Sequence, residues 1–397
     1  MNLLTTTTTL ILFISAAGVI QAIILAAILY FHPKSDKSVN SFLSLHILTV
    51  SIFMLMPLVQ YLFSWQDITF LFSFQFLIGP FLYLYVRSFK ETITWRKAWP
   101  HYMAFVLFLF LDIQAYFGWM RKYPSSENIP PEVLTDPRSY VRVMLRNIQM
   151  IAYYFLSLKA LGKYQQSIRQ LYSETSRISL NWIRSLLNGF LLLIITVFIL
   201  FFLVFKYPEK FYVLILINTA IITPYIYIVA LKGLSQPTLW QLQTGKSKES
   251  IEKEISEAVK IEKPAKDSQP LIKGLPGDKS NEIITRILDL MEKDKLYQEP
   301  ELTLQALSDK INIPSYQASQ AINDGLKKSF YDLINGYRVE EAKHLLCEPK
   351  NSNYTILSVG FEAGFNSKTT FNTVFKKFTG MTPSEYREKH KPIGQMT

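Results

Sequence analysis

Seven long apolar stretches fill most of the first 231 residues and restrict what this chain can fold into. A helix that crosses a bilayer needs about 20 mostly apolar residues, because the hydrocarbon core is about 30 Å thick. Buried helices of a large soluble core are the alternative, but seven stretches of near-membrane length separated by mostly short polar turns argue against it. The sequence therefore predicts seven membrane spans, at approximately 7–31, 40–62, 68–90, 98–118, 139–161, 185–206 and 210–231.

Composition changes after Leu231, where the chain takes on the character of a soluble protein. Residues 232–277 are rich in Lys and Glu and end in turn residues. A narrow apolar stripe at Ile251, Ile255 and Ala258 favours a short helix or weak coiled coil, and a flexible tether is the alternative. The sequence predicts an all-α protein: a seven-helix transmembrane bundle over 1–231, a cytoplasmic linker over 232–277 and a cytoplasmic all-α domain over 278–392.

Charge in the loops between the expected spans predicts their orientation. One set of loops carries eleven Lys and Arg residues, and the opposite set carries six. Loops rich in Lys and Arg stay in the cytoplasm, so an odd number of spans puts the N-terminus outside and the C-terminal part inside. The single cysteine, Cys347, lies in that C-terminal part, which suits a reducing compartment.

Several polar residues lie in the outer halves of the expected spans, where burying a polar group is costly. An ion pair of Asp112 with Arg146 that holds two helices together is one interpretation. A ligand pocket open to the outside is the other. The candidate ligand-binding residues are Gln75, Asp112, Arg146 and Asn218.

The segment from Leu304 to Asn323 has the pattern of a helix-turn-helix unit. Its first helix has an inward face of Leu304, Leu307 and Ile311, and a turn at "NIP" follows. The second helix buries Ala318, Ala321 and Ile322. Steps of 100° per residue then predict that four residues point away from this core: Tyr316, Ser319, Gln320 and Asn323.

A second unit follows a connecting helix of about 17 residues, which is about 25 Å long. Gly364 supplies its turn, where a positive φ angle suits glycine. The second helix has a predicted core stripe at Phe371, Val374, Phe375 and Phe378. Its outward residues can read base edges or neutralise phosphates: Thr369, Asn372, Thr373 and Lys376. The connector can place two reading helices about 34 Å apart, one turn of the DNA groove.

The segment from Thr303 to Arg387 resembles the DNA-binding domain of AraC/XylS-type regulators. The matching residues are "RVEEAKHLL" at 338–346, Gly364-Phe365, Ser367, Phe371, Phe375-Lys376, Gly380, Thr382-Pro383 and Tyr386-Arg387. The resemblance implies that both second helices enter adjacent major-groove segments. It makes the following residues candidates for facing bases: Ser315, Tyr316, Ser319, Gln320, Lys368, Thr369, Asn372 and Thr373. The whole layout also resembles the membrane-bound subgroup with seven spans.

These observations predict a transcription regulator tethered in a bacterial cytoplasmic (inner) membrane that couples an external or membrane signal to gene expression. Its expected partners are double-stranded DNA, the lipid bilayer, an unidentified signal ligand, a second copy in a homodimer and, by the resemblance, RNA polymerase. The sequence contains no nucleotide-binding or metalloprotease motif, so we predict no enzyme activity, cofactor or metal. A transporter or receptor with a regulatory cytoplasmic tail is the alternative function.

Overall fold

A computed structural model of the chain describes residues 3–32, 37–62, 71–123, 137–176, 178–207, 211–235 and 277–390. Within these ranges every element is a helix, apart from one isolated antiparallel bridge between Tyr172 and Thr303. The predicted all-α class is confirmed. The contacts divide the described residues into two units, one up to Lys163 and again from Leu180 to 235, the other over Tyr164–Ser179 and from 277 onward.

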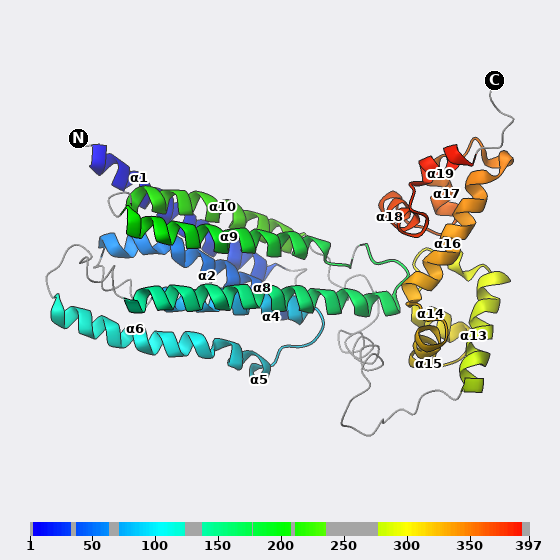
Figure 1. Ribbon diagram of the computed structural model, residues 1–397, viewed down its shortest axis with the longest axis horizontal. Helices are drawn as coiled ribbons and strands as arrows, with labels where there is room; N and C mark the ends of the chain where they lie inside the picture. Colours follow the sequence, from blue (N-terminus) through cyan, green and yellow to red (C-terminus); the bar gives the residue numbers. More distant parts are fainter. Residues whose placement is uncertain are drawn as a thin grey trace. The chain divides into compact units, whose positions relative to one another are not determined.

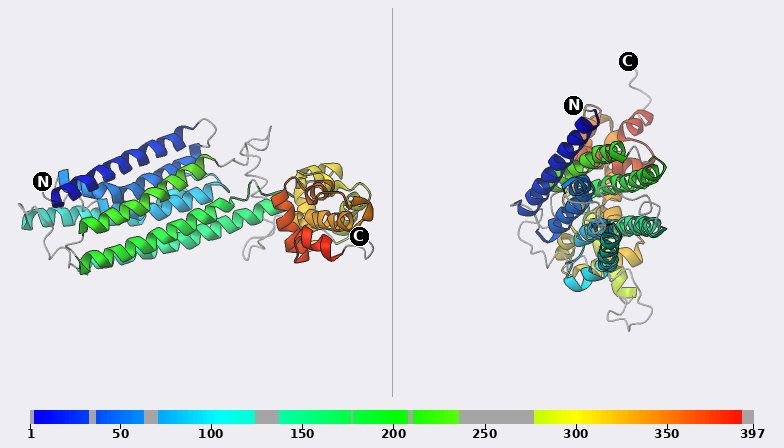
Figure 2. Two further views of the ribbon diagram at one scale, coloured as in Figure 1. Left: turned by 90° about the horizontal axis from the view of Figure 1, so that it is seen from above. Right: turned by 90° about the vertical axis from the view of Figure 1, so that its left-hand side faces the viewer.

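The first unit is a bundle of long apolar helices that run alongside one another (Figures 1 and 2). Helix α2 packs against α1, α4 and α10, and α10 also packs against α1 and α9. Helix α6 packs against α3. The elements of this unit are α1 (Leu3–Phe31), α2 (Lys37–Leu62), α3 (Leu71–Phe74), α4 (Ile78–Ser88), α5 (Trp95–Ala98), α6 (Met103–Lys122), α8 (Pro137–Leu171), α9 (Asn181–Lys206) and α10 (Phe211–Leu234).

Five helical segments among the described residues are long and apolar enough to cross a membrane: parts of α1, α2, α9 and α10, and the run that contains α5 and α6. The two other expected spans differ for separate reasons. A 3-10 turn at Gln75–Leu77 interrupts the helix expected over 68–90. Helix α8 carries Arg142, Arg146 and Lys159 within the span expected over 139–161, which lowers its mean hydropathy. The number seven therefore stays a prediction.

Helix α8 continues ten residues beyond its expected end and reaches Leu171. The sequence after Lys163 contains several Gln and Arg residues, so hydropathy alone gave no span there. Its apolar residues nevertheless recur at helical spacing, and Tyr164, Ile168 and Leu171 are buried. The contacts place residues 164–179 with the second unit, whereas the sequence assigned them to the first domain.

The second unit is built around α16 (Phe330–Cys347), the helix that connects the two helix-turn-helix units. In Figure 1, α13, α14 and α15 gather around one end of α16, and α17, α18 and α19 gather around the other. The bounds of these helices are α13 (Gly277–Glu292), α14 (Leu304–Lys310), α15 (Ser315–Gln320), α17 (Ile356–Glu362), α18 (Lys368–Thr379) and α19 (Pro383–Lys389).

The core stripes of this unit follow the predicted periodicity with one exception. The inward residues of the first helix-turn-helix unit are all buried, and so are Phe371, Val374 and Phe375 in the second. Phe378 is instead 41% exposed, which corrects the predicted stripe. Phe378 lies in the last turn of α18, and its ring is beside Gly336 of α16. Gly336 has no side chain that could cover the ring.

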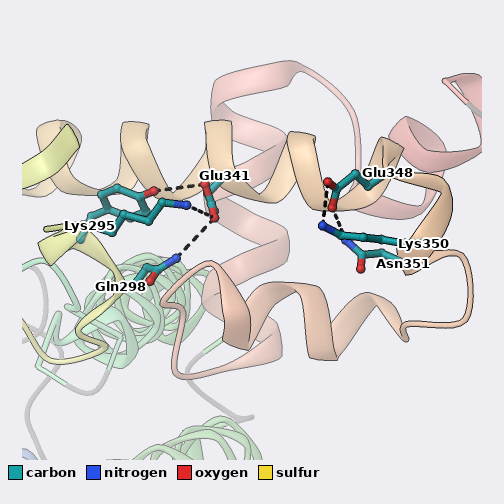
Figure 3. A network of polar contacts seen from close by, with 7 residues as sticks. Lys295, Gln298, Glu341, Glu348, Lys350 and Asn351 are labelled. Carbon is teal, nitrogen blue, oxygen red and sulfur yellow. Dashed lines mark hydrogen bonds and ion pairs between the residues drawn. The ribbon is translucent and has the colours of Figure 1, made fainter. Parts of the chain in front are cut away.

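Polar contacts fasten α16 to the 3-10 turn that precedes the first helix-turn-helix unit (Figure 3). The Glu341 carboxylate accepts hydrogen bonds from Lys295 Nζ at 3.0 Å and from the Tyr297 hydroxyl at 3.1 Å. Burial and the nearby Glu341 carboxylate raise the pKa of Tyr297 to about 12, so the phenol stays protonated and donates. The same figure shows a polar group just beyond the C-terminal end of α16: Glu348, Lys350 and Asn351.

The predicted linker lies almost entirely outside the described residues, which end at 235 and resume at 277. The apolar stripe at Ile251, Ile255 and Ala258 is therefore not described by the structure.

Candidate nucleic-acid interface

The first helix-turn-helix unit begins where Thr303 caps α14. The Thr303 hydroxyl accepts a hydrogen bond from the Ala306 amide at 3.1 Å, which satisfies one of the free amides at the helix start. The turn passes through Asn312 in a left-handed conformation, with φ of 51°, and short polar residues such as asparagine tolerate that conformation. Helix α15 then starts at Ser315 and passes directly into a π-helical turn at Ala321–Gly325.

Three of the four predicted reading residues of α15 are partly exposed: Ser315, Tyr316 and Gln320. The fourth, Ser319, is only 3% exposed, which corrects the expectation that it points outward. A step of 100° from the fully buried Ala318 puts Ser319 on the flank of the helix and not on its far side. Asn323, one turn later, donates a hydrogen bond to the Ser319 hydroxyl at 3.4 Å. Ser319 is therefore a packing residue.

The turn of the second unit depends on Gly364 for two reasons. Its φ angle of +93° is one that residues with a side chain rarely adopt. A Cβ atom at this position would also lie 2.6 Å from the Tyr297 carbonyl oxygen and 2.7 Å from the Gln298 Cα atom. The close approach packs this turn directly onto the segment that precedes the first unit. Helix α18 then begins with Ser367 as its cap, whose hydroxyl accepts from the Thr370 amide at 3.1 Å.

The predicted reading residues of α18 lie along one side of the helix. Lys368, Thr369, Thr373 and Lys376 are exposed and Asn372 is partly exposed. The opposite side is buried, with Phe371 and Phe375 both inaccessible to solvent. An asparagine amide can bond both the donor and the acceptor of adenine in the major groove, and a lysine can neutralise a phosphate. Helix α18 therefore presents polar and basic groups from a rigid apolar core.

Two exposed lysines, Lys327 and Lys328, follow the first reading helix. They are the first basic residues after α15 begins, so α15 itself carries no Lys or Arg.

Arg338 on α16, the first residue of the matching "RVEEAKHLL" run, is buried, and the sequence alone gave it no role. Its guanidinium donates to the carbonyl oxygens of Tyr297 at 2.7 Å, Glu299 at 2.7 Å and Pro300 at 3.3 Å. Burial lowers the pKa of Arg338 to about 10, which leaves it charged at neutral pH. The side chain thus fastens the connecting helix to the loop before α14. Polarity alone would have placed an arginine in this helix at the surface.

Three of the four candidate ligand-binding residues of the first unit lie in a polar cluster formed by α3 with the 3-10 turn that follows it, α6 and α8, with one correction. Asp112 pairs with Arg142 Nη1 at 2.7 Å and not with Arg146. Ser73 donates a hydrogen bond to Asp112, and Arg146 donates one to Gln75. Arg142 and Arg146 are one helical turn apart, so either could reach a carboxylate on a neighbouring helix.

Asn218, the fourth candidate, lies on α10 and is partly exposed. Its Oδ1 atom is buried and has no hydrogen-bond partner among the residues that the structure describes.

Comparison with known proteins supports the same interpretation of the C-terminal unit. A helix-turn-helix domain family matches residues 307–389. Uncharacterized HTH-type transcriptional regulators of Staphylococcus aureus strains COL and MSSA476 are each 28% identical over 104 residues, which is 26% of this chain. The chain covers 13% of the length of these relatives. No solved structure matches the chain. The C-terminal part of the chain therefore contains a helix-turn-helix domain, over residues 307–389.

Proposed function

We propose that this protein is a membrane-tethered transcription regulator that binds specific DNA sequences. The observation that carries the proposal is the side of α18 formed by Lys368, Thr369, Asn372, Thr373 and Lys376, backed by a buried aromatic core within a matched helix-turn-helix domain. Ser315, Tyr316 and Gln320 are the reading residues of the first unit. Two reading helices on one connector fit two neighbouring segments of the major groove.

The apolar helices of the first unit anchor the regulator in a bacterial cytoplasmic membrane. Five segments long and apolar enough to span a bilayer support this. The excess of Lys and Arg in one set of loops supports an orientation with the N-terminus outside and the DNA-binding domain in the cytoplasm. Confinement to the membrane plane raises the effective concentration for pairing of two copies, so the DNA-bound form is a homodimer. RNA polymerase is the partner that the AraC-type domain implies.

The polar cluster of the first unit is the proposed site of signal detection. Asp112 and Gln75 are fully buried, and Arg146 is 5% exposed with its Nε atom lacking a hydrogen-bond partner among the described residues. Ionisable residues within apolar helices are costly and often functional. A signal ligand that bonds these groups would change how α3, α6 and α8 pack.

Selection of duplexes by the intact protein tests the proposed function. The full chain in lipid nanodiscs is incubated with fragmented genomic DNA, and bound fragments are sequenced over several rounds. We expect enrichment of one shared sequence motif. Recovery of fragments without any shared motif would show that the helix-turn-helix domain does not read sequence.

Asn372→Ala is expected to reduce discrimination between the selected duplex and a variant that differs at one base pair. Loss of a two-point contact to a base costs about 1–3 kcal/mol, and the substitution lies on the outer side of α18, away from the buried core. Binding measurements with both duplexes check this. Equal losses of affinity for the two duplexes would mean that Asn372 does not contact a base.

Lys376→Ala is expected to weaken binding to all sequences alike. Its exposed ammonium group suits a phosphate contact, and loss of one such contact lowers the slope of log affinity against log salt by about one. The slope is measured by titrations over a range of salt concentrations. Lys389→Ala, another exposed lysine, on α19, is the matched control. An unchanged slope for Lys376→Ala would remove this residue from the interface.

A further inference from the structure

The residues that follow α8 form a compact set of hydrogen bonds with the C-terminal helices of the same unit. Ser173 is fully buried. Its amide donates to the Leu302 carbonyl oxygen at 3.2 Å, and its hydroxyl donates to the same oxygen at 2.6 Å. Asn335 Nδ2 donates to the Ser173 carbonyl oxygen at 2.9 Å, and Arg338 donates to its hydroxyl at 3.2 Å. Every polar group of Ser173 is thus bonded to a residue more than a hundred positions away.

Two neighbouring residues extend these contacts along the unit. The Arg169 guanidinium lies 5.5 Å from the centre of the Tyr331 ring, at the start of α16. The Glu174 carboxylate accepts from the Thr370 hydroxyl at 3.3 Å, in the first turn of α18. One short segment therefore contacts the loop before the first helix-turn-helix unit, the connecting helix and the second reading helix.

The segment is also held in shape by bonds of its own. The Tyr164 hydroxyl donates to the Ile178 carbonyl oxygen at 2.8 Å, and Gln165 donates to the Ser179 carbonyl oxygen at 2.7 Å. The Ser176 amide donates to Glu174 at 2.7 Å. A loop fixed in this way gives a bound geometry at a lower cost in conformational entropy than a flexible one.

We propose that residues 164–179 are a docking segment through which α8 is coupled to the connecting helix α16 and to α18, the second reading helix. The proposal rests on the DNA-binding function proposed above. Helix α8 is continuous from Pro137 to Leu171, and it carries Arg142 and Arg146 of the polar cluster near its start. About 25 residues of helix, or roughly 40 Å, separate Arg146 from the end of α8. A turn or shift of this helix changes the position of Ser173 and Glu174, and hence of α16 and α18.

Coupling between two sites is reciprocal, so DNA at the reading helices must also act on α8. This gives a test that a purely structural role for the segment would not pass. The full chain is placed in nanodiscs of phosphatidylethanolamine and phosphatidylglycerol. Hydrogen exchange of the backbone amides is then measured without DNA and with the selected duplex.

Without DNA, we expect the Ser173 amide to be protected by its bond to Leu302. Ser173→Ala removes two buried hydrogen bonds of the side chain, which should accelerate exchange at 172–174 by about tenfold or more. Ser176→Ala changes an exposed serine three residues away and is the matched control, with little expected effect. If 172–174 exchange as an unstructured loop in the unaltered protein, the segment is not docked and the proposal fails.

With the selected duplex, we expect exchange at 164–171 to slow at least about threefold in the unaltered protein and in Ser176→Ala, and to slow much less in Ser173→Ala. Protection of 172–174 without any response of 164–171 to the duplex would overturn the coupling. If no duplex is selected at all, the DNA-binding function and the coupling fail together, whereas the measurement without DNA still reports whether the segment is docked.

Discussion

Phe375→Ala is expected to lower the free energy of unfolding of the second helix-turn-helix unit by about 3–5 kcal/mol, because truncating a buried phenylalanine leaves a cavity. Phe375 is inaccessible to solvent and packs edge-on against Phe371 and Tyr386, with ring centroids 5.6 Å and 5.4 Å away. The core around it contains Val339, Val359 and Phe365, so a cavity there touches α16, α17 and the turn before α18. Pulse proteolysis of the full chain in increasing urea measures the loss.

Phe378→Ala is the matched control, on the same helix and with the same change of side chain. Because Phe378 is 41% exposed, we expect its truncation to cost less than about 1.5 kcal/mol. Similar losses for both variants would contradict the assignment of the buried and exposed sides of α18, and with it the reading face.

Arg338→Met is expected to destabilise the C-terminal unit by about 3–5 kcal/mol, since it leaves several buried carbonyl groups without donors. Methionine fills a similar volume, so the loss reports on the hydrogen bonds to Tyr297, Glu299 and Pro300 more than on a cavity. The same urea experiment measures it.

Arg338→Lys separates the two properties of the arginine side chain. Lysine keeps the charge but lacks the planar group that bonds several carbonyl oxygens at once. We expect a loss nearly as large as that of Arg338→Met. Full stability in the lysine variant would mean that charge alone is what the site requires.

Local patterns in the sequence predicted much of the fold of the C-terminal unit. The spacing of apolar residues predicted the buried faces of α14, α15 and most of α18, and Gly364 marked a turn that has a positive φ angle. The exceptions have local causes. Ser319 lies on the flank of its helix, where a small side chain is covered, and Phe378 lies where the facing residue is a glycine.

Contacts between residues far apart in the sequence could not be predicted from the periodicity of apolar residues. Ser173 is more than 160 residues away from both Asn335 and Arg338. No spacing pattern in the sequence therefore indicates that these residues meet. The polar, Gln-rich end of α8 looked like a loop because hydropathy finds membrane spans and not amphipathic extensions. The ion-pair partner of Asp112 depends on which side of α8 faces α6. Arg142 and Arg146 lie one turn apart on α8, so the sequence alone could not decide between them.

The most direct test of the central claim is to map the DNA bound by the intact protein in living cells. Protein and DNA are crosslinked, the membrane fraction is separated from the soluble fraction, and the DNA that copurifies with the protein from each is sequenced. We expect the bound DNA to be recovered with the membranes and to share one motif, and we expect Asn372→Ala to broaden that motif. Recovery of the membrane-associated protein without any DNA that shares a motif would contradict the proposal of a membrane-tethered, sequence-specific regulator.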